Sequence, residues 1–276
     1  MFSRIAVGLD GSPHADAALS HALRIAAVSG AILRGVHVVD RSLLGGSVVA
    51  DLSASVGFQP FLNLTAEMRS ALRSAGEAIV ADFEARAKER SVAFESRLEE
   101  GSVSEFLERA ARESDLFVAG SRGVNAAHRG DLVGRHADAL ARRLHSPLLL
   151  APQSYQEFRS PLLAYDSSVK AKRALDLVAG LAALLELPVT VLAITEDAAE
   201  GRARLAEAEA ALAARGLAAQ FLVRGGEPDE AILAAADPDV GLIAMGAHGH
   251  GRIVELVLGS TTDSVLRRAM VPVLCA

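Results

Sequence analysis

Apolar segments from the first half of this 276-residue chain recur, in the same order, in its second half. The first segment of each half ends in an aspartate, Asp10 or Asp166, and small polar residues and an Ala/Leu-rich stretch follow it. Self-similarity of this kind indicates a duplicated structural unit. The first copy is longer because it holds an extra segment, residues 41–66. The matching segments are 4–12 and 161–169, 32–40 and 188–197, 114–123 and 239–249, and 145–152 and 270–276.

Within each copy, short apolar runs alternate with segments of helical periodicity. Continuous runs such as LLLA (148–151) are typical of strands buried on both faces of a parallel sheet. Alternating strands and helices imply right-handed crossovers and a three-layer sandwich. The sequence therefore predicts an α/β fold of two tandem α/β/α domains, residues 1–152 and 161–276, each with a five-stranded parallel sheet of order 3-2-1-4-5. The link 151–161, which has a proline near each end, marks the boundary.

The same pattern gives approximate limits for each element. The expected strands are 3–9, 32–39, 92–99, 115–119 and 146–151, then 161–165, 188–195, 217–224, 240–245 and 271–275. The expected helices are 13–29, 67–90, 103–113 and 135–144, then 169–186, 200–215, 228–236 and 260–269.

Composition excludes several classes of protein. The 28 Lys and Arg residues against 34 Asp and Glu give a net charge of −6, and neither copy is basic, so no nucleic-acid partner is expected. No run of about 18 apolar residues occurs, which excludes a membrane-spanning helix. The first residues lack the apolar core of a signal peptide, so we expect a cytoplasmic location. The single cysteine excludes a disulfide framework.

A glycine-rich loop follows the fourth strand of the second copy, with the spacing Gly246-x2-Gly249-x9-Gly259-Ser260. In an open parallel sheet, ligands bind beyond the carboxyl ends of the strands where strand order reverses, here between the first and fourth strands. Glycines let the backbone approach a ligand, and a helix beginning at Ser260 offers free N–H groups to a phosphate. The pattern favours a phosphate-binding loop facing Asp166. The alternative is a plain turn in which Ser260 caps the helix.

These residues resemble the universal stress protein family, whose nucleotide-binding members share a G-x2-G-x9-G-[ST] pattern. The likeness covers nearly all of both copies apart from 41–66 and the link, so the chain resembles a tandem member. The resemblance implies a stress-response protein that binds ATP in its second domain and has a regulatory or interaction role. A divalent metal such as Mg²⁺ on the phosphates would be typical, although the sequence offers no carboxylate cage for it.

The resemblance also implies a set of site residues. It places Asp166 by the adenosine and Ile194 against the base. It lines the ribose and phosphate path with Met245, Gly246, His248 and Gly249, and it holds the phosphates with Gly259, Ser260, Thr261 and Thr262. Ala164 and Tyr165, which precede the aspartate, complete the expected set.

The first copy departs from the pattern. It keeps Asp10, Gly120 and Gly123, but Gly134 comes one residue late and Arg135 follows it in place of a serine or threonine. Long side chains thus replace small donors where phosphates would lie. We expect no nucleotide site in this copy.

Signatures of catalytic sites are missing from the sequence. It has neither the G-x4-G-K-[ST] of a P-loop nor the G-x-S-x-G of a nucleophile elbow. The segments after the first strands, LDGSPHAD and YDSSVKAK, lack the signatures of nucleotidyl transferases and ATP pyrophosphatases. The eight histidines have no cysteine or carboxylate at ligand spacing, so no metal ligand is expected. With no nucleophile, general base or arginine finger, we expect no catalytic residue and at most a weak ATPase.

Two alternatives to an ATP-binding regulatory protein stay open. The chain could be a protein-interaction scaffold whose glycine loop is only structural, or an enzyme that uses ATP as its substrate. The insertion 41–66 is apolar apart from Arg41 and Asp51. It is expected to pack across the domain interface or over the first-copy cleft, and the alternative is a lid or docking surface.

The last strand of each copy, 148–152 and 271–276, is short, apolar and unprotected by charge. In the family such strands pair across a two-fold axis, and a tandem chain can satisfy this pairing internally. We therefore expect the two copies to pack as an intramolecular pseudo-dimer, with a homodimer as a further level of assembly.

Overall fold

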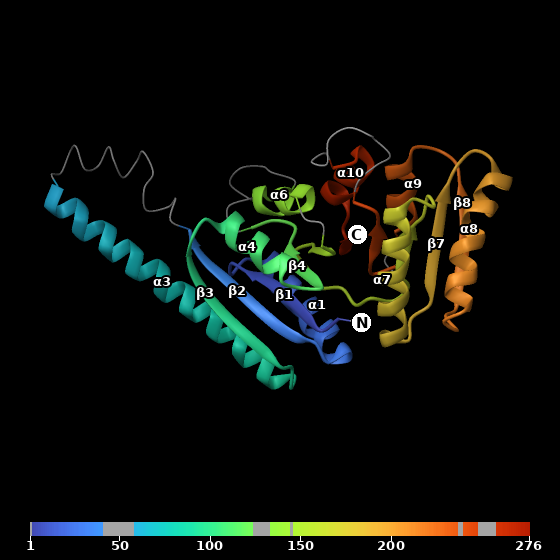
Figure 1. Ribbon diagram of the computed structural model, residues 1–276. Coiled ribbons are helices and arrows are strands. Elements are labelled where there is room, and N and C mark those ends of the chain that lie inside the picture. The colour runs from blue at the N-terminus through green and yellow to red at the C-terminus, as the bar shows by residue number, and fades with distance from the viewer. Residues whose placement is uncertain (1, 41–57, 124–132, 144–145, 237–239, 248–257) are drawn as a thin grey trace.

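The computed structural model describes residues 2–40, 58–123, 133–143, 146–236, 240–247 and 258–276 (Figure 1). The first half contains β1 (Arg4–Leu9), α1 (Pro13–Ser29), β2 (Ile32–Asp40), α3 (Phe58–Glu89), β3 (Phe94–Gly101), α4 (Val103–Arg112), β4 (Leu116–Gly120), α6 (Arg135–Arg143) and β5 (Leu148–Ala151). The second half contains β6 (Leu162–Ala164), α7 (Val169–Leu185), β7 (Val189–Ile194), α8 (Ala198–Ala213), β8 (Ala219–Arg224), α9 (Pro228–Ala235), β9 (Ile243–Met245), α10 (Ser260–Arg268) and β10 (Val273–Cys275).

The described strands form one ten-stranded sheet of order β3-β2-β1-β4-β5-β10-β9-β6-β7-β8. Within each half the neighbours are parallel and follow the order 3-2-1-4-5, so the predicted fold class is confirmed. The halves meet where β5 and β10 pair antiparallel, with Leu148 opposite Cys275 and Leu150 opposite Val273. The two apolar edge strands thus pair with each other within the chain, and the two predicted sheets are continuous.

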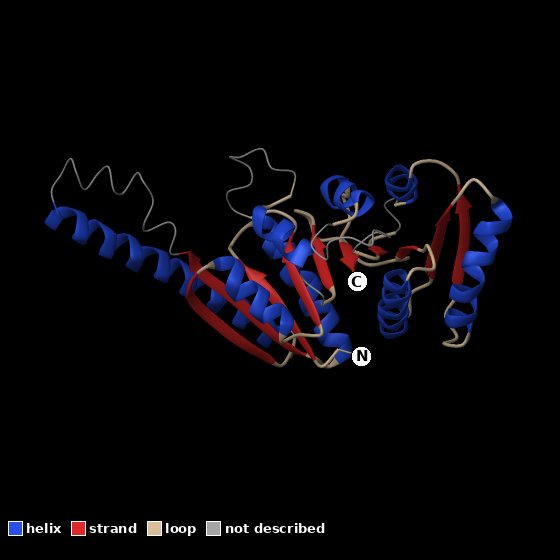
Figure 2. Ribbon diagram, turned by 45° about the horizontal axis from the view of Figure 1, so that its top comes forward, coloured by secondary structure: helices blue, strands red, loops and turns tan. Residues whose placement is uncertain are grey.

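Helices cover both faces of this sheet, as Figure 2 shows. Helices α1, α3, α7 and α8 share one buried apolar cluster with the strands, and α4, α6, α9 and α10 share another on the opposite face. The strands are near-continuous apolar runs because both of their faces are buried: every residue of Leu148–Ala151 lies inside. None of the described helices combines the length and apolarity needed to cross a bilayer.

Helix α3 begins earlier than its sequence suggested, at Phe58 rather than at residue 67. Pro60 is compatible with this start because the first turn of a helix needs no intrahelical N–H donor. Figure 1 shows these first turns extending past the edge of the sheet, away from the second half. The expectation that the insertion packs across the domain interface is therefore wrong for residues 58–66, whereas 41–57 lie outside the described residues.

The link between the halves packs onto α1. Phe158 is buried, and its ring stacks on His21 at a centroid distance of 4.9 Å, while Tyr155 lies 4.6 Å from the same histidine. Neither ring nitrogen of His21 has a hydrogen-bond partner in the described part of the chain. Burial lowers the pKa of His21 to about 4, because a charged ring would lose its hydration there.

The free energy of unfolding should therefore decrease at acidic pH, because protonation of His21 favours the unfolded chain. In the unfolded chain His21 binds a proton near pH 6.5, whereas in the folded chain it does so only near pH 4. The stabilisation that comes from burying the neutral ring is therefore complete above pH 6.5 and is lost as the pH falls from 6.5 to 4. At pH 5 the loss is about 2 kcal/mol in the free energy of unfolding relative to pH 7. Urea titrations of the wild type and His21→Phe at both pH values measure it, and the variant should show a smaller decrease. Equal decreases would contradict the prediction.

Candidate functional site

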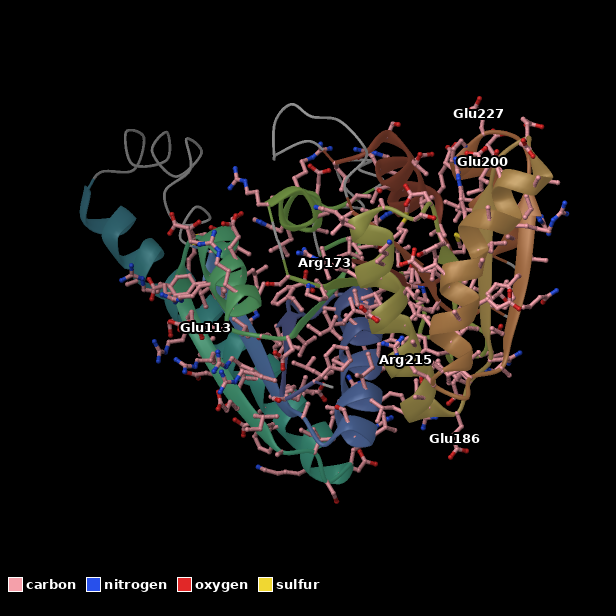
Figure 3. The ribbon with its side chains drawn as sticks, turned by 45° about the vertical axis from the view of Figure 1, so that its right-hand side comes forward. Glu113, Arg173, Glu186, Glu200, Arg215 and Glu227 are labelled. Carbon is pink, nitrogen blue, oxygen red and sulfur yellow. The ribbon has the colours of Figure 1, made fainter. Side chains whose placement is uncertain are left out.

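The carboxyl ends of β6, β7 and β9 lie side by side, because β6 runs between the other two strands. The chain leaves β6 into α7 on one face of the sheet, and it reaches β9 from α9 on the other face. The ends of β6 and β9 therefore flank the point where strand order reverses. In Figure 3, Glu200 and Glu227 lie at this end of the second half and Glu186 lies at the other.

Asp166 closes the turn between β6 and α7. Its Oδ1 accepts a hydrogen bond from the Ser168 N–H at 3.0 Å, and Ser167 between them has a φ of 64°. The hydroxyl of Ser168 then caps α7 by accepting from the Ala171 N–H at 3.1 Å. The carboxylate is left exposed at the strand end, in position to meet a ligand.

The two residues before Asp166 face opposite sides of the sheet, as neighbours on a strand must. Ala164 packs with the cluster under α9 and α10, which Ile194 at the end of β7 also contacts. Tyr165 is 2% exposed and belongs to the other cluster. The structure therefore brings Ala164 and Ile194 to one face and directs the Tyr165 side chain away from them.

Gly246, which follows β9, is in close contact with the first turn of α7. A Cβ added at Gly246 would lie 2.9 Å from Cβ of Lys170, so only a glycine permits this approach. Thr262 in α10 is buried, and its hydroxyl donates to the Gly246 carbonyl oxygen at 3.2 Å. Met245 is also buried. The end of β9 thus joins the first turns of α7 and α10.

Helix α10 begins without a side-chain cap among the described residues. Gly259 occupies the capping position at φ −59° and ψ 143°, where it has no side chain to accept a hydrogen bond from the first turn. Any residue can adopt this φ, so the glycine matters for the space that it leaves rather than for its conformation. Ser260 is exposed and Thr261 is partly exposed beside it.

A carboxylate in the first turn of α10 is neutralised by arginines. Asp263 accepts from Arg267 at 2.8 Å and from Arg142, which belongs to α6 of the first half, at 3.2 Å. The hydrogen bond from Arg267, together with the charges of Arg267 and Arg142, lowers the pKa of Asp263. Without these cations its negative charge would oppose anion binding at the helix start.

Lys170, which the sequence pattern did not single out, also lies at this edge. It lies in the first turn of α7 beside Gly246, and burial followed by the charge of Arg173 lowers its pKa. Its position follows the aspartate by four residues, as His14 follows Asp10, so an alignment of the copies could have found it. His248 and Gly249 of the predicted site lie outside the described residues.

At the equivalent edge of the first half, the backbone of residues 121–123 lies close to the carboxylate at the end of β1. Asp10 accepts from the Ser12 N–H at 2.9 Å, as Asp166 does from Ser168. A Cβ at Gly123 would lie 2.9 Å from Oδ2 of Asp10, and the Gly134 N–H donates to the Ser121 carbonyl oxygen at 2.8 Å. The segment 121–123 thus lies between Asp10 and the start of α6.

The same fold occurs in known proteins. The model of the universal stress protein family matches residues 1–152 and, a second time, residues 157–276. The chain belongs to the universal stress protein family. The two matches cover both halves of the sheet, so each half is one unit of this family.

Relatives with the same description occur in bacteria and in an archaeon. The universal stress protein Slr1230 of Synechocystis sp. is 33% identical over 177 residues, which are 63% of this chain and 62% of that relative's own length. A universal stress protein of Mycolicibacterium smegmatis is 28% identical over 98% of this chain and 95% of its own length. The crystal structure of a universal stress protein from Archaeoglobus fulgidus has a TM-score of 0.74 at 19% identity, covers 99% of this chain and 98% of its own, and shares the fold.

Proposed function

We propose that this universal stress protein binds ATP at the carboxyl edge of its second half, with the phosphates at the start of α10. The observation that carries the proposal is the N-terminus of α10, where Gly259 leaves the first-turn N–H groups uncapped by its own residue. The glycine spacing before it and the exposed Asp166 beside the strand-order switch support the same assignment.

Each described residue has a simple role in this proposal. The Asp166 carboxylate accepts from the hydroxyls of the ribose, and Ile194 and Ala164 offer apolar contact to the base. The N–H groups and hydroxyls of Ser260 and Thr261 donate to phosphate oxygens. Met245 and Gly246 form the wall between these groups, and Thr262 fixes the wall to α10 through its hydroxyl. Lys170 adds positive charge nearby.

Mg²⁺ would accompany ATP by neutralising charge on the phosphate oxygens. Among the described residues, no group of three or more His, Cys, Asp or Glu side chains lies close enough to hold a metal ion. The donor set of this edge therefore fits a metal carried by the nucleotide rather than one held by the protein.

The proposed role is regulatory, in a stress response, with nucleotide occupancy controlling an interaction with a protein partner. A scaffold without a nucleotide site and a slow ATPase remain the competing functions. The cytoplasmic location, the homodimer and the domain limits 1–152 and 161–276 stay predictions from the sequence.

An ATP titration by calorimetry tests the proposal. Saturable binding is expected, together with release of phosphate far below one turnover per second, because the described edge offers no activated nucleophile or base. A second measurement looks for nucleotide that remains bound during purification. The freshly purified protein is denatured, and the released nucleotides are identified by mass spectrometry. No saturable binding would favour the scaffold, and continued release of phosphate above the uncatalysed rate would favour the slow ATPase.

A further inference from the structure

A cavity of about 320 Å³ lies between α1 and α3, in the first half and away from the proposed nucleotide edge. Its floor is apolar and buried and consists of Leu9, Ala15 and Leu19, with Ile79 of α3 opposite. Asp16, Asp82 and Arg86 lie at its mouth, where the two carboxylate side chains are 63% and 67% exposed. The remaining lining residues are Gly11, Ser12 and Ala78.

The region between α7 and α8 in the second half is equivalent to this cavity, and the sequence repeat identifies the corresponding residues. Leu9 and Tyr165 each precede the aspartate whose carboxylate closes the first turn. Helices α3 and α8 end in the same way: the Val92 N–H donates to the Ala87 carbonyl oxygen at 3.0 Å, and the Leu217 N–H donates to that of Leu212 at 3.1 Å. This register aligns Asp82 with Glu207.

In the second half a tyrosine fills this place. Tyr165 is buried, and its hydroxyl donates to Glu207 Oε2 at 3.2 Å. Lys172, which is equivalent to Asp16, holds the other carboxylate oxygen of Glu207 at 2.8 Å. In the second half, the phenol ring of Tyr165 therefore occupies the space between α7 and α8, and its hydroxyl is hydrogen-bonded to the Glu207 carboxylate.

We propose that the cavity between α1 and α3 binds a small phenol, whose ring lies on Leu9 and whose hydroxyl meets Asp82 and Arg86. The first half has the smaller Leu9 where the second has Tyr165, and it keeps a carboxylate, Asp82, where the second has Glu207. The cavity therefore lacks an aromatic ring such as that of Tyr165, but it retains a carboxylate, Asp82, that can accept a hydrogen bond from a hydroxyl. This cavity is open to solvent at its charged mouth, and its volume of about 320 Å³ leaves room for one aromatic ring.

The charges at the mouth fit a hydroxyl group better than an anion. Arg86 pairs with Asp16 and lies 3.6 Å from Asp82, and it also donates to the Ser20 hydroxyl at 2.9 Å. Two carboxylates and one guanidinium repel a carboxylate or phosphate ligand. A phenol hydroxyl both donates and accepts, so it can use Asp82 and Arg86 together.

This site is independent of ATP. The cavity is lined by residues of α1 and α3, which cover one face of the sheet. Ala164 and Ile194 of the proposed nucleotide edge pack on the opposite face. Asp10 does not line the cavity. A ligand in it leaves the carboxyl edge of the second half untouched.

The test is calorimetric titration of the full chain with p-cresol, and with toluene as the analogue without a hydroxyl. One p-cresol site per chain is expected, with toluene at least tenfold weaker. Leu9→Tyr supplies the missing ring from the protein and should abolish p-cresol binding while leaving the ATP titration unchanged. Ile79→Phe narrows the cavity from α3 and should have the same effect, which covers the case in which Leu9→Tyr does not fold.

The matched variant in the second half is Tyr165→Leu, which should open the equivalent place and add a second p-cresol site. No saturable p-cresol binding to the wild type would overturn the proposal. So would undiminished binding in folded Leu9→Tyr or Ile79→Phe. Equal affinities for p-cresol and toluene would overturn the assignment of a phenol.

Discussion

The Gly259→Asp variant is expected to lose ATP binding by more than a hundredfold while keeping its fold. Gly259 has a φ of −59°, which an aspartate adopts without strain, and aspartate is a favoured helix-capping residue. The new carboxylate would accept from the first-turn N–H groups that the phosphates are proposed to use, and it would also repel them. Losing two or three hydrogen bonds to a charged ligand, at about 1.5–3 kcal/mol each, accounts for the expected loss. Calorimetry gives the affinity, and thermal unfolding should show an unchanged or higher Tm.

The control for this variant is Gly134→Asp at the start of α6. We expect one ATP per wild-type chain, because Arg135 stands in the first half where Ser260 stands in the second. The backbone of 121–123 also lies against Asp10 there. Gly134→Asp should therefore leave ATP affinity unchanged. Two equal sites would mean that both halves bind ATP, and loss of binding only in Gly134→Asp would mean that the nucleotide had been assigned to the wrong half.

The Gly241→Ala variant is expected to be among the most destabilising single changes in the chain. Gly241 precedes β9 with a φ of 67°, and an added Cβ would lie 2.3 Å from the Glu157 carbonyl oxygen of the link. The left-handed backbone costs an alanine roughly 1–2 kcal/mol, and the overlap with the link adds about 1–3 kcal/mol. The free energy of unfolding in urea should fall by about 2–5 kcal/mol.

Gly216→Ala separates the two causes. Gly216 has a φ of 68°, but nothing lies within 4 Å of an added Cβ. It should therefore lose only the roughly 1–2 kcal/mol due to backbone conformation. Equal losses in Gly241→Ala and Gly216→Ala would show that the link moves aside without cost.

The order of strands and helices could be predicted because both faces of the sheet are covered. Strands such as Leu148–Ala151 are then apolar throughout, and helices such as α1 and α7 carry their own caps, Ser12 and Ser168. The early start of α3 was not predicted from the sequence, and the backbone of its first turns extends past the edge of the sheet (Figure 1).

The sequence alone indicates only those members of the candidate site that would act through their backbone or their residue type. The spacing of Gly246, Gly259 and Ser260 is visible in the sequence, and the structure places them at the end of β9 and the start of α10. The Tyr165 side chain points away from Ala164 because neighbours on a strand alternate, so local periodicity does encode this direction. The proximity of Lys170 depends on how closely α7 approaches Gly246, which local periodicity does not encode.

The antiparallel junction of β5 with β10 is formed inside one polypeptide, so dilution cannot dissociate it. Identical subunits that meet on a two-fold axis must each carry a self-complementary surface, and every substitution then appears twice. A covalently joined pair has no such restriction. Arg142 of α6 can hold Asp263 of α10, while the first residues of these same helices differ, Arg135 in one and Ser260 in the other. Because the two halves are covalently joined, the corresponding edges of their sheets can differ in sequence without disturbing the junction between them.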